Sequence, residues 1–87
     1  MVKAASVDQI KQEIQDHTVM VYSKTYCPHC NAAKQLLQEK GIEFEARELD
    51  QMSDGKDMQD ALEFLTKQRT VPNIFIKGDH LGGNSEL

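Results

Sequence analysis

Cysteine is scarce in this sequence, since only two of its 87 residues are cysteine. Two thiols cannot build the disulfide framework that stabilises small secreted domains, so the stability of this chain must come from packing. Long apolar runs are lacking too, and no segment has the length needed to span a bilayer. The first residues are followed by polar and charged side chains rather than by the apolar core of a secretory signal. These absences favour a cytoplasmic protein in a reducing compartment.

Positive charge is not in excess either, because 10 lysines and arginines stand against 14 aspartates and glutamates, for a formal net charge of −4. This balance gives the chain no general means of binding nucleic acid or an anionic membrane, and we expect neither as a partner. The sequence contains no linker, internal repeat or low-complexity tract. Its length predicts one small globular domain over residues 1–87, which we expect to be a monomer.

The two cysteines lie close together, in the sequence Cys-Pro-His-Cys at residues 27–30. They follow an apolar run at residues 18–22 that is typical of a strand buried on both faces, and they open a predicted helix that ends near Lys40. A thiol at a helix N-terminus feels the helix dipole and unpaired backbone N–H groups, and both stabilise the nucleophilic thiolate. The spacing therefore predicts a redox site in which Cys27 attacks and Cys30, one turn later, resolves.

Half of a zinc site is the alternative interpretation of a close cysteine pair. Zinc requires three or four protein ligands. The remaining imidazole donors are His17, His29 and His80, and none has the spacing to the cysteines that metal sites show. The sequence therefore favours redox chemistry, and we expect no metal.

Four residues around the thiols are further candidates. Pro28 suits the first turn of a helix, where no N–H is needed, and it stiffens the dithiol loop. Lys24 and His29 are candidate thiolate-stabilising residues because a nearby cation favours a charged sulfur, although each is also compatible with a solvated surface position. Tyr26 is either a partly buried aromatic at a strand end or a side chain that lies over a ligand.

Two segments nearer the C-terminus have backbones suited to binding a peptide. A cis bond at Val71-Pro72 would expose the backbone of Val71 to an extended peptide, whereas a trans bond there is ordinary strand structure. Residues 82–86, Gly-Gly-Asn-Ser-Glu, combine an open backbone with a helix start that suits a charged group. Their simpler interpretation is a hairpin exit and a helix cap at Asn84 or Ser85.

The predicted elements run in the order helix, strand, helix, strand, helix, strand, strand. The first helix ends near Asp16, and Ser6 with Gln9 resembles a capping box at its start. Later elements are expected at residues 42–47 (strand), 53–65 (helix), 73–77 (strand), 78–79 (turn) and 80–81 (strand). Strand–helix–strand units imply a parallel first pair, and the hairpin adds an antiparallel one. The predicted fold is an α/β, four-stranded mixed sheet with helices on both faces.

Three motifs in this order resemble the dithiol glutaredoxin family: Lys-Thr-Tyr-Cys-Pro-His-Cys at residues 24–30, Gln-Arg-Thr-Val-Pro at residues 68–72 and Gly-Gly-Asn-Ser at residues 82–85. The resemblance covers nearly the whole chain and implies a thioredoxin-like fold. Details at residues 23–26 and 70–74 are most similar to small fungal members.

The resemblance implies a glutathione-dependent thiol–disulfide oxidoreductase, with glutathione as co-substrate. Its partners would be glutathione, glutathionylated proteins and protein disulfides. Cys27 matches the cysteine that attacks a glutathione mixed disulfide. Cys30 matches the cysteine that closes an intramolecular disulfide.

A glutathione groove is implied as well. Its positions in this sequence are Lys24, Tyr26, Gln68, Thr70, Val71, Pro72, Asn84, Ser85 and Glu86. Lys24 and Gln68 match the residues that hold the glycine carboxylate of the tripeptide. The backbone of Val71 matches the segment, before a cis proline, that pairs with the cysteinyl unit. Ser85 and Glu86 match the positions that face the γ-glutamyl end.

The chain departs from the family pattern at three places. Position 29 is more often tyrosine, and Cys-Pro-His-Cys is the pattern of a strongly oxidising periplasmic thiol oxidase, so a thiol oxidase is one alternative function. Glu86 stands where aspartate is usual. Members also continue into a last helix that packs on the sheet, whereas this chain ends at Leu87, and we expect that helix to be missing. A second alternative is a dimer that binds a glutathione-ligated [2Fe–2S] cluster, which the stiff Pro28 disfavours.

Overall fold

The helices and strands follow the predicted order in the computed structural model, which describes residues 2–87. Within this range the helices are α1 (Ala4–Asp16), α2 (Pro28–Glu39) and α3 (Gly55–Thr66), and the strands are β1 (Val19–Ser23), β2 (Glu45–Glu48), β3 (Asn73–Ile76) and β4 (Asp79–Gly82). Two short 3-10 turns, η1 (Leu49–Gln51) and η2 (Asn84–Glu86), follow β2 and β4. None of the helices described here combines the length and the hydrophobicity needed to cross a membrane.

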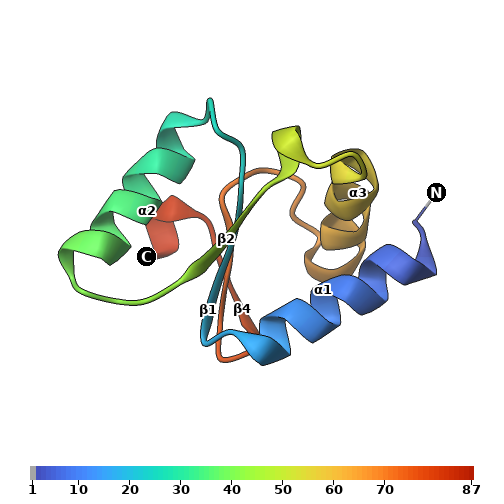
Figure 1. Cartoon of the computed structure of the whole chain (residues 1–87), viewed down its shortest axis with the longest axis horizontal. Coiled ribbons are helices and arrows are strands. Elements are labelled where there is room, and N and C mark those ends of the chain that lie inside the picture. Colours follow the sequence, from blue (N-terminus) through green and yellow to red (C-terminus); the bar gives the residue numbers. More distant parts are fainter. Residues whose placement is uncertain (1) are drawn as a thin grey trace.

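The four strands form one mixed sheet in the order β2-β1-β3-β4. β1 pairs in parallel with β2, while β3 is antiparallel to both β1 and β4. Helix α2 lies on one side of this sheet, and α1 and α3 lie together on the other (Figure 1). The predicted mixed sheet with helices on both faces, a thioredoxin-like fold, is confirmed.

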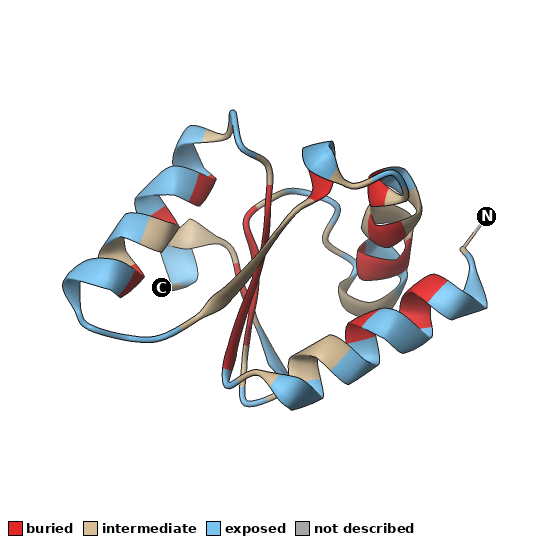
Figure 2. Cartoon of the chain, viewed as in Figure 1, coloured by how far each residue is buried: buried red, intermediate tan, exposed pale blue. Residues whose placement is uncertain are grey.

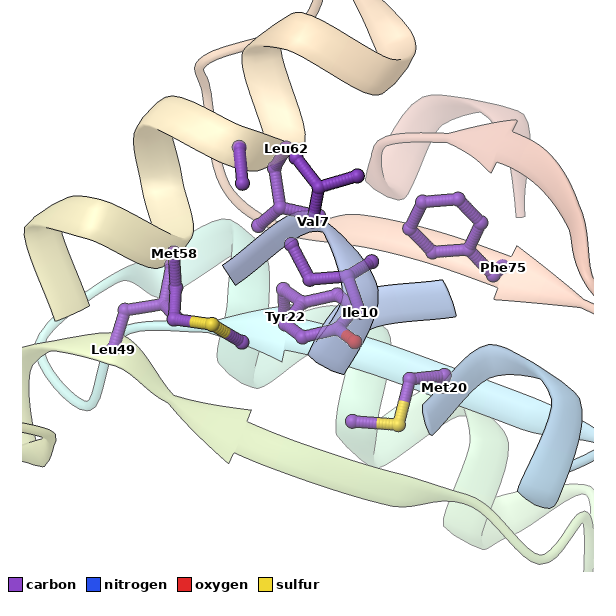
Figure 3. Close-up of a cluster of buried hydrophobic side chains, with 9 residues drawn as sticks. Val7, Ile10, Met20, Tyr22, Leu49, Met58, Leu62 and Phe75 are labelled. Carbon is purple, nitrogen blue, oxygen red and sulfur yellow. The ribbon is translucent and has the colours of Figure 1, made fainter. Parts of the chain in front are cut away.

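Strand β1 is the centre of the core because its side chains alternate between the two faces. Met20 and Tyr22 pack with α1 and α3, in the cluster drawn in Figure 3. Val19 and Val21 pack with Ala33 and other side chains against α2. All five β1 residues are buried, as the colouring of Figure 2 shows. Burying each side chain of this size contributes roughly 1.5–3 kcal/mol, so β1 is held firmly from both sides.

The start of α1 differs from the prediction. The helix begins at Ala4, and Lys3 in the capping position provides no side-chain hydrogen bond. Ser6 lies inside the helix and is buried, so the capping box of Ser6 and Gln9 is wrong. Contacts of Val7 with the core, rather than a local cap, decide where this helix begins.

The second strand starts later than the alternating pattern predicted, at Glu45 rather than at residue 42. The end of α2 accounts for the difference. Gly41 has a positive φ of 68° and its N–H donates to Gln38, while the N–H of Ile42 donates to Leu37, which together form a Schellman ending. Ile42 is therefore part of the helix terminus and is not free to join the sheet.

Two turns near the C-terminus are displaced by one residue. The hairpin turns at Lys77-Gly78 rather than at residues 78–79, and both turn residues have positive φ angles, 53° and 82°. Lysine rarely adopts a positive φ, so a lysine at residue 77 gives little indication in the sequence that the turn begins there. The capping position of η2 is Gly83, not Asn84 or Ser85, and the backbone N–H of Gly83 donates to Glu86 Oε1 at 2.7 Å.

Candidate active site

Cys27 stands where the chain leaves the carboxyl end of β1 and enters α2. It occupies the capping position of the helix, and Pro28 is the first helical residue. The Sγ atom of Cys27 accepts a hydrogen bond from the backbone N–H of Cys30 at 3.2 Å. A sulfur in this position faces the unpaired N–H groups of the first turn, which stabilise negative charge. The predicted placement of the two thiols on the helix start is confirmed.

The two thiols differ strongly in exposure. Cys27 is partly exposed, whereas Cys30 is completely buried under the first turn of α2. Burial, and then the hydrogen bond with Cys27, raise the pKa of the Cys30 thiol to about 11. Cys30 therefore keeps its proton at neutral pH, and only Cys27 can meet a substrate from outside.

The cis-proline segment forms the opposite side of the site. The Val71-Pro72 bond is cis. The Cys27 thiol points at the backbone carbonyl oxygen of Val71, 3.7 Å away. The Cys27 sulfur therefore lies next to the backbone of the cis-proline segment.

Two adjoining hollows share Thr70 and Val71, and Cys27 lines one of them. One is lined by His29, Gln68, Thr70, Val71, Pro72, Gly83, Asn84, Ser85 and Glu86. The other is lined by Lys24, Tyr26, Cys27, Pro28, Gln59, Arg69, Thr70 and Val71. Every predicted glutathione-binding position lies in one hollow or the other, together with both candidate thiolate-stabilising residues. Tyr26 is 69% exposed at the rim, so the interpretation of a partly buried aromatic is wrong.

Three of the predicted binding side chains, those of Gln68, Ser85 and Glu86, already make hydrogen bonds within their own loops. The Gln68 amide donates to the carbonyl oxygens of Thr70 and Pro72, both at 3.0 Å. The Glu86 carboxylate accepts from Gly83 N–H and from the Ser85 hydroxyl, at 2.7 and 2.6 Å, and these bonds lower its pKa. A ligand that used these groups would replace bonds that shape the groove walls.

A carboxylate that the sequence reading did not single out anchors the loop before Cys27. Asp50 accepts hydrogen bonds from both the backbone N–H and the hydroxyl of Thr25, and these two bonds lower the pKa of Asp50. Thr25 and Asp50 follow the carboxyl ends of β1 and β2, which are parallel neighbours. That adjacency was available from the predicted topology, because such strand ends meet at one edge of a sheet.

Comparison with known proteins agrees with the geometry of this site. A family model described as glutaredoxin matches residues 19–81. The chain is 51% identical to glutaredoxin-C1 of Arabidopsis thaliana over 88% of its own length, and 48% identical to glutaredoxin-1 of the fungus Rhizophagus irregularis over 92%. Plant and fungal relatives are thus about equally similar. The chain spans 62% of the Arabidopsis relative and 79% of the fungal one.

The fold is shared with a solved glutaredoxin structure. The crystal structure of a buckwheat glutaredoxin–glutathione complex superposes with a TM-score of 0.93 at 41% sequence identity. The superposition covers 94% of this chain and 74% of the buckwheat chain.

Proposed function

The chain belongs to the glutaredoxin family, and from this premise we propose that it is a glutathione-dependent thiol–disulfide oxidoreductase. Its substrates in this proposal are protein–glutathione mixed disulfides and protein disulfides in a reducing compartment such as the cytoplasm. One observation carries the proposal: Cys27 is open to the groove at the start of α2, while Cys30 is buried directly behind it. This arrangement provides one thiol for attack from outside and one for resolution from within.

Reduction of a glutathionylated protein needs Cys27 alone. The Cys27 thiolate attacks the glutathionyl sulfur, the bond to the protein sulfur breaks, and the protein leaves as a thiolate that takes up a proton. A glutathione thiolate then attacks the sulfur of the glutathione held on Cys27. Oxidised glutathione leaves and Cys27 returns to the thiolate, so that the protein sulfur is reduced while the sulfur of the one incoming glutathione is oxidised to the disulfide level.

Reduction of a protein disulfide also needs Cys30. Cys27 attacks one sulfur of the substrate and remains joined to it. Cys30 loses its proton and attacks the Cys27 sulfur, so that the substrate leaves fully reduced and a Cys27–Cys30 disulfide forms. Two glutathione molecules then reduce this disulfide in two exchange steps.

In this proposal, glutathione binds in the two adjoining hollows, one of which Cys27 lines. The backbone of Val71, next to the Cys27 sulfur, would pair with the cysteinyl unit of the tripeptide. Lys24 and Gln68 would meet its glycine carboxylate, and the loop of Ser85 and Glu86 would meet its γ-glutamyl end. The buckwheat structure supports this site by its overall similarity, since it is a complex with glutathione.

Two serine substitutions test the roles of the thiols. Cys27→Ser should abolish reduction of both a glutathionylated peptide and a protein disulfide. Cys30→Ser should retain reduction of the glutathionylated peptide and lose reduction of the protein disulfide, because only resolution needs the second thiol. An active Cys27→Ser protein beside an inactive Cys30→Ser protein in the glutathionylated-peptide assay would reverse the two assignments.

A further inference from the structure

A chain of polar side chains lies behind the buried thiol, on the side away from the groove. Ser23, the last residue of β1, has no solvent exposure, and its hydroxyl donates to Glu48 Oε1 at 2.6 Å. Glu48 is the last residue of β2 and stands opposite Ser23 in the parallel pairing. The two side chains therefore meet on the α2 side of the sheet edge.

Helix α2 brings Cys30 to the same place. Lys34 lies four residues after Cys30, so the two side chains share one face of the helix. The Lys34 ammonium binds Glu48 Oε2 at 2.8 Å and draws that face against the end of β2. The Ser23 side chain also lies near the Cys30 thiol, and its hydroxyl opposes the larger effect of burial on the pKa of Cys30. The side chains of Cys30, Ser23 and Glu48 thus gather at one place, with the hydrogen bond from Ser23 to Glu48 leading away from the buried thiol.

The resolving step has a proton to remove at this position. Cys30 is completely buried, so water cannot take its proton directly. A neutral thiol is a poor nucleophile, and the proton must leave as the new S–S bond forms. Glu48 is partly exposed, with 23% of its side chain accessible, so its side chain reaches solvent.

We propose that Ser23 and Glu48 form a proton relay that takes the proton of Cys30 while Cys30 attacks a mixed disulfide on Cys27. The proposal rests on the proposed function, because it assumes that Cys30 is the resolving thiol. It assigns a role to two residues on strand ends, outside the groove and outside the dithiol motif.

The relay conserves atoms and charge. Before the step, Ser23 donates its hydrogen to the Glu48 carboxylate and offers a lone pair to the Cys30 S–H. During the step, the Cys30 proton moves to the Ser23 oxygen and the Ser23 proton moves to Glu48. The Cys30–Cys27 bond forms, the bond from Cys27 to the substrate breaks, and the substrate leaves as a thiolate. Glu48 then releases its proton to water.

The charged neighbours of the relay come from two elements. Lys34 on α2 is the cation that faces Glu48, and Cys27 is the titratable group that faces Cys30. The other charged residues of β2, Glu45 and Arg47, pair with His17 and Glu13 instead. Since residues alternate along a strand, Glu45 lies on the opposite face from Glu48 and provides a matched control.

The test isolates the resolving step by loading Cys27 with thionitrobenzoate as a mixed disulfide and following release of the coloured thiolate without glutathione. Glu48→Gln keeps the shape and the hydrogen bond to Ser23 but accepts no proton. Release should slow about a hundredfold near neutral pH, the low end of what a positioned base contributes. The deficit should shrink as the pH rises toward the value at which Cys30 ionises by itself, about 11. Ser23→Ala should show the same pH profile, and the double variant should be no slower than either single variant.

Four outcomes decide between the explanations. Glu45→Gln should release the thiolate at the wild-type rate. A deficit in Glu48→Gln that stays constant across pH would indicate a structural role and would overturn the relay. The absence of any deficit would also overturn it, because the proton of Cys30 would then pass to the departing thiolate. Release by the Cys30→Ser protein would overturn the proposed function instead, since it would show that Cys30 does not resolve.

Discussion

The Sγ atom of Cys27 lies 3.7 Å from the backbone carbonyl oxygen of Val71, although 44 positions separate the two residues. The first belongs to a helix start and the second to the cis-proline segment before β3. Their proximity joins two local features that lie far apart in the sequence into one site.

Asp50→Asn should loosen the loop that carries Cys27. The carboxylate of Asp50 binds Thr25 through two hydrogen bonds, which lower its pKa. A lowered pKa in the folded state means that the contribution to stability is present above the ordinary value of about 3.9 and is lost as the pH falls through the lower folded value. The protection factor of the Thr25 amide, which removes the intrinsic pH dependence of exchange, should therefore fall in the wild type on acidification. In Asp50→Asn the protection factor should be low already at pH 7 and should change little with acid.

Asp8→Asn, on an exposed position of α1, is the control for the loss of one carboxylate. It should leave Thr25 exchange as in the wild type. Equal protection of Thr25 in Asp50→Asn and the wild type at pH 7 would show that other contacts hold this loop.

Tyr22→Phe should lower the free energy of unfolding. The buried Tyr22 hydroxyl donates to Glu13 Oε1 at 2.7 Å, and Glu13 also binds Arg47. A hydrogen bond to a charged group contributes about 1.5–3 kcal/mol, which is the expected loss at pH 7 in urea unfolding.

The same substitution has a pH signature. Burial, and then the bond to Glu13, raise the pKa of Tyr22 well above its usual range. The raised pKa contributes stability that is complete below the unfolded value of about 10 and is lost as the pH rises above it. The difference between wild type and Tyr22→Phe should therefore shrink above pH 10. A constant difference up to higher pH would mean that the phenol is not held neutral by the fold.

Gly55→Ala should destabilise the protein and disturb the site, whereas Gly41→Ala should only destabilise it. A Cβ on Gly55 would overlap the backbone carbonyl oxygen of Leu49, next to Asp50, so the backbone must move. Overpacking of this kind costs about 1–3 kcal/mol. Gly41 has a φ of +68° and open space around its Cβ position, so alanine there costs roughly 1 kcal/mol through conformation alone.

Urea midpoints measure both costs, and Thr25 amide exchange reports on the site. Gly55→Ala should show faster exchange at Thr25, and Gly41→Ala should not. A Gly55→Ala protein with the wild-type midpoint would mean that the turn before α3 shifts without cost.

His29→Tyr should make the Cys27–Cys30 couple more reducing. His29 lines the hollow beside Cys27, and an imidazole there stabilises a thiolate better than a phenol does. Stabilising the reduced form raises the reduction potential, so removing the imidazole should lower it. Equilibration of both proteins with glutathione buffers measures the change. An unchanged potential would leave His29 as a solvated residue of the helix start and would remove the motive for a thiol oxidase function.

The local features of this protein were predictable from its sequence. Short-range physics decides them: apolar spacing marked β1, α2 and α3, Pro28 marked a helix start, and Gly41 marked a helix end. The same reasoning placed Cys27 at the helix N-terminus, and the motif order placed the groove positions. Local reasoning placed the hairpin turn one residue too late. The first turn residue is Lys77, which has a positive φ that lysine rarely adopts.

Tertiary packing decided what the site contains beyond these features. The burial of Cys30 depends on α2 lying against the sheet, and the contacts of Thr25 with Asp50 and of Ser23 with Glu48 depend on β1 and β2 being parallel neighbours with matched ends. Ser6 had the sequence of a cap but became a buried helix residue, because packing of α1 on the core outweighs a single hydrogen bond. Periodicity and capping act over a few residues, whereas a hydrogen bond between strand ends forms only after the sheet has brought distant segments together. The sequence alone thus determined the elements and the dithiol, and only the tertiary structure determined which polar groups stand behind it.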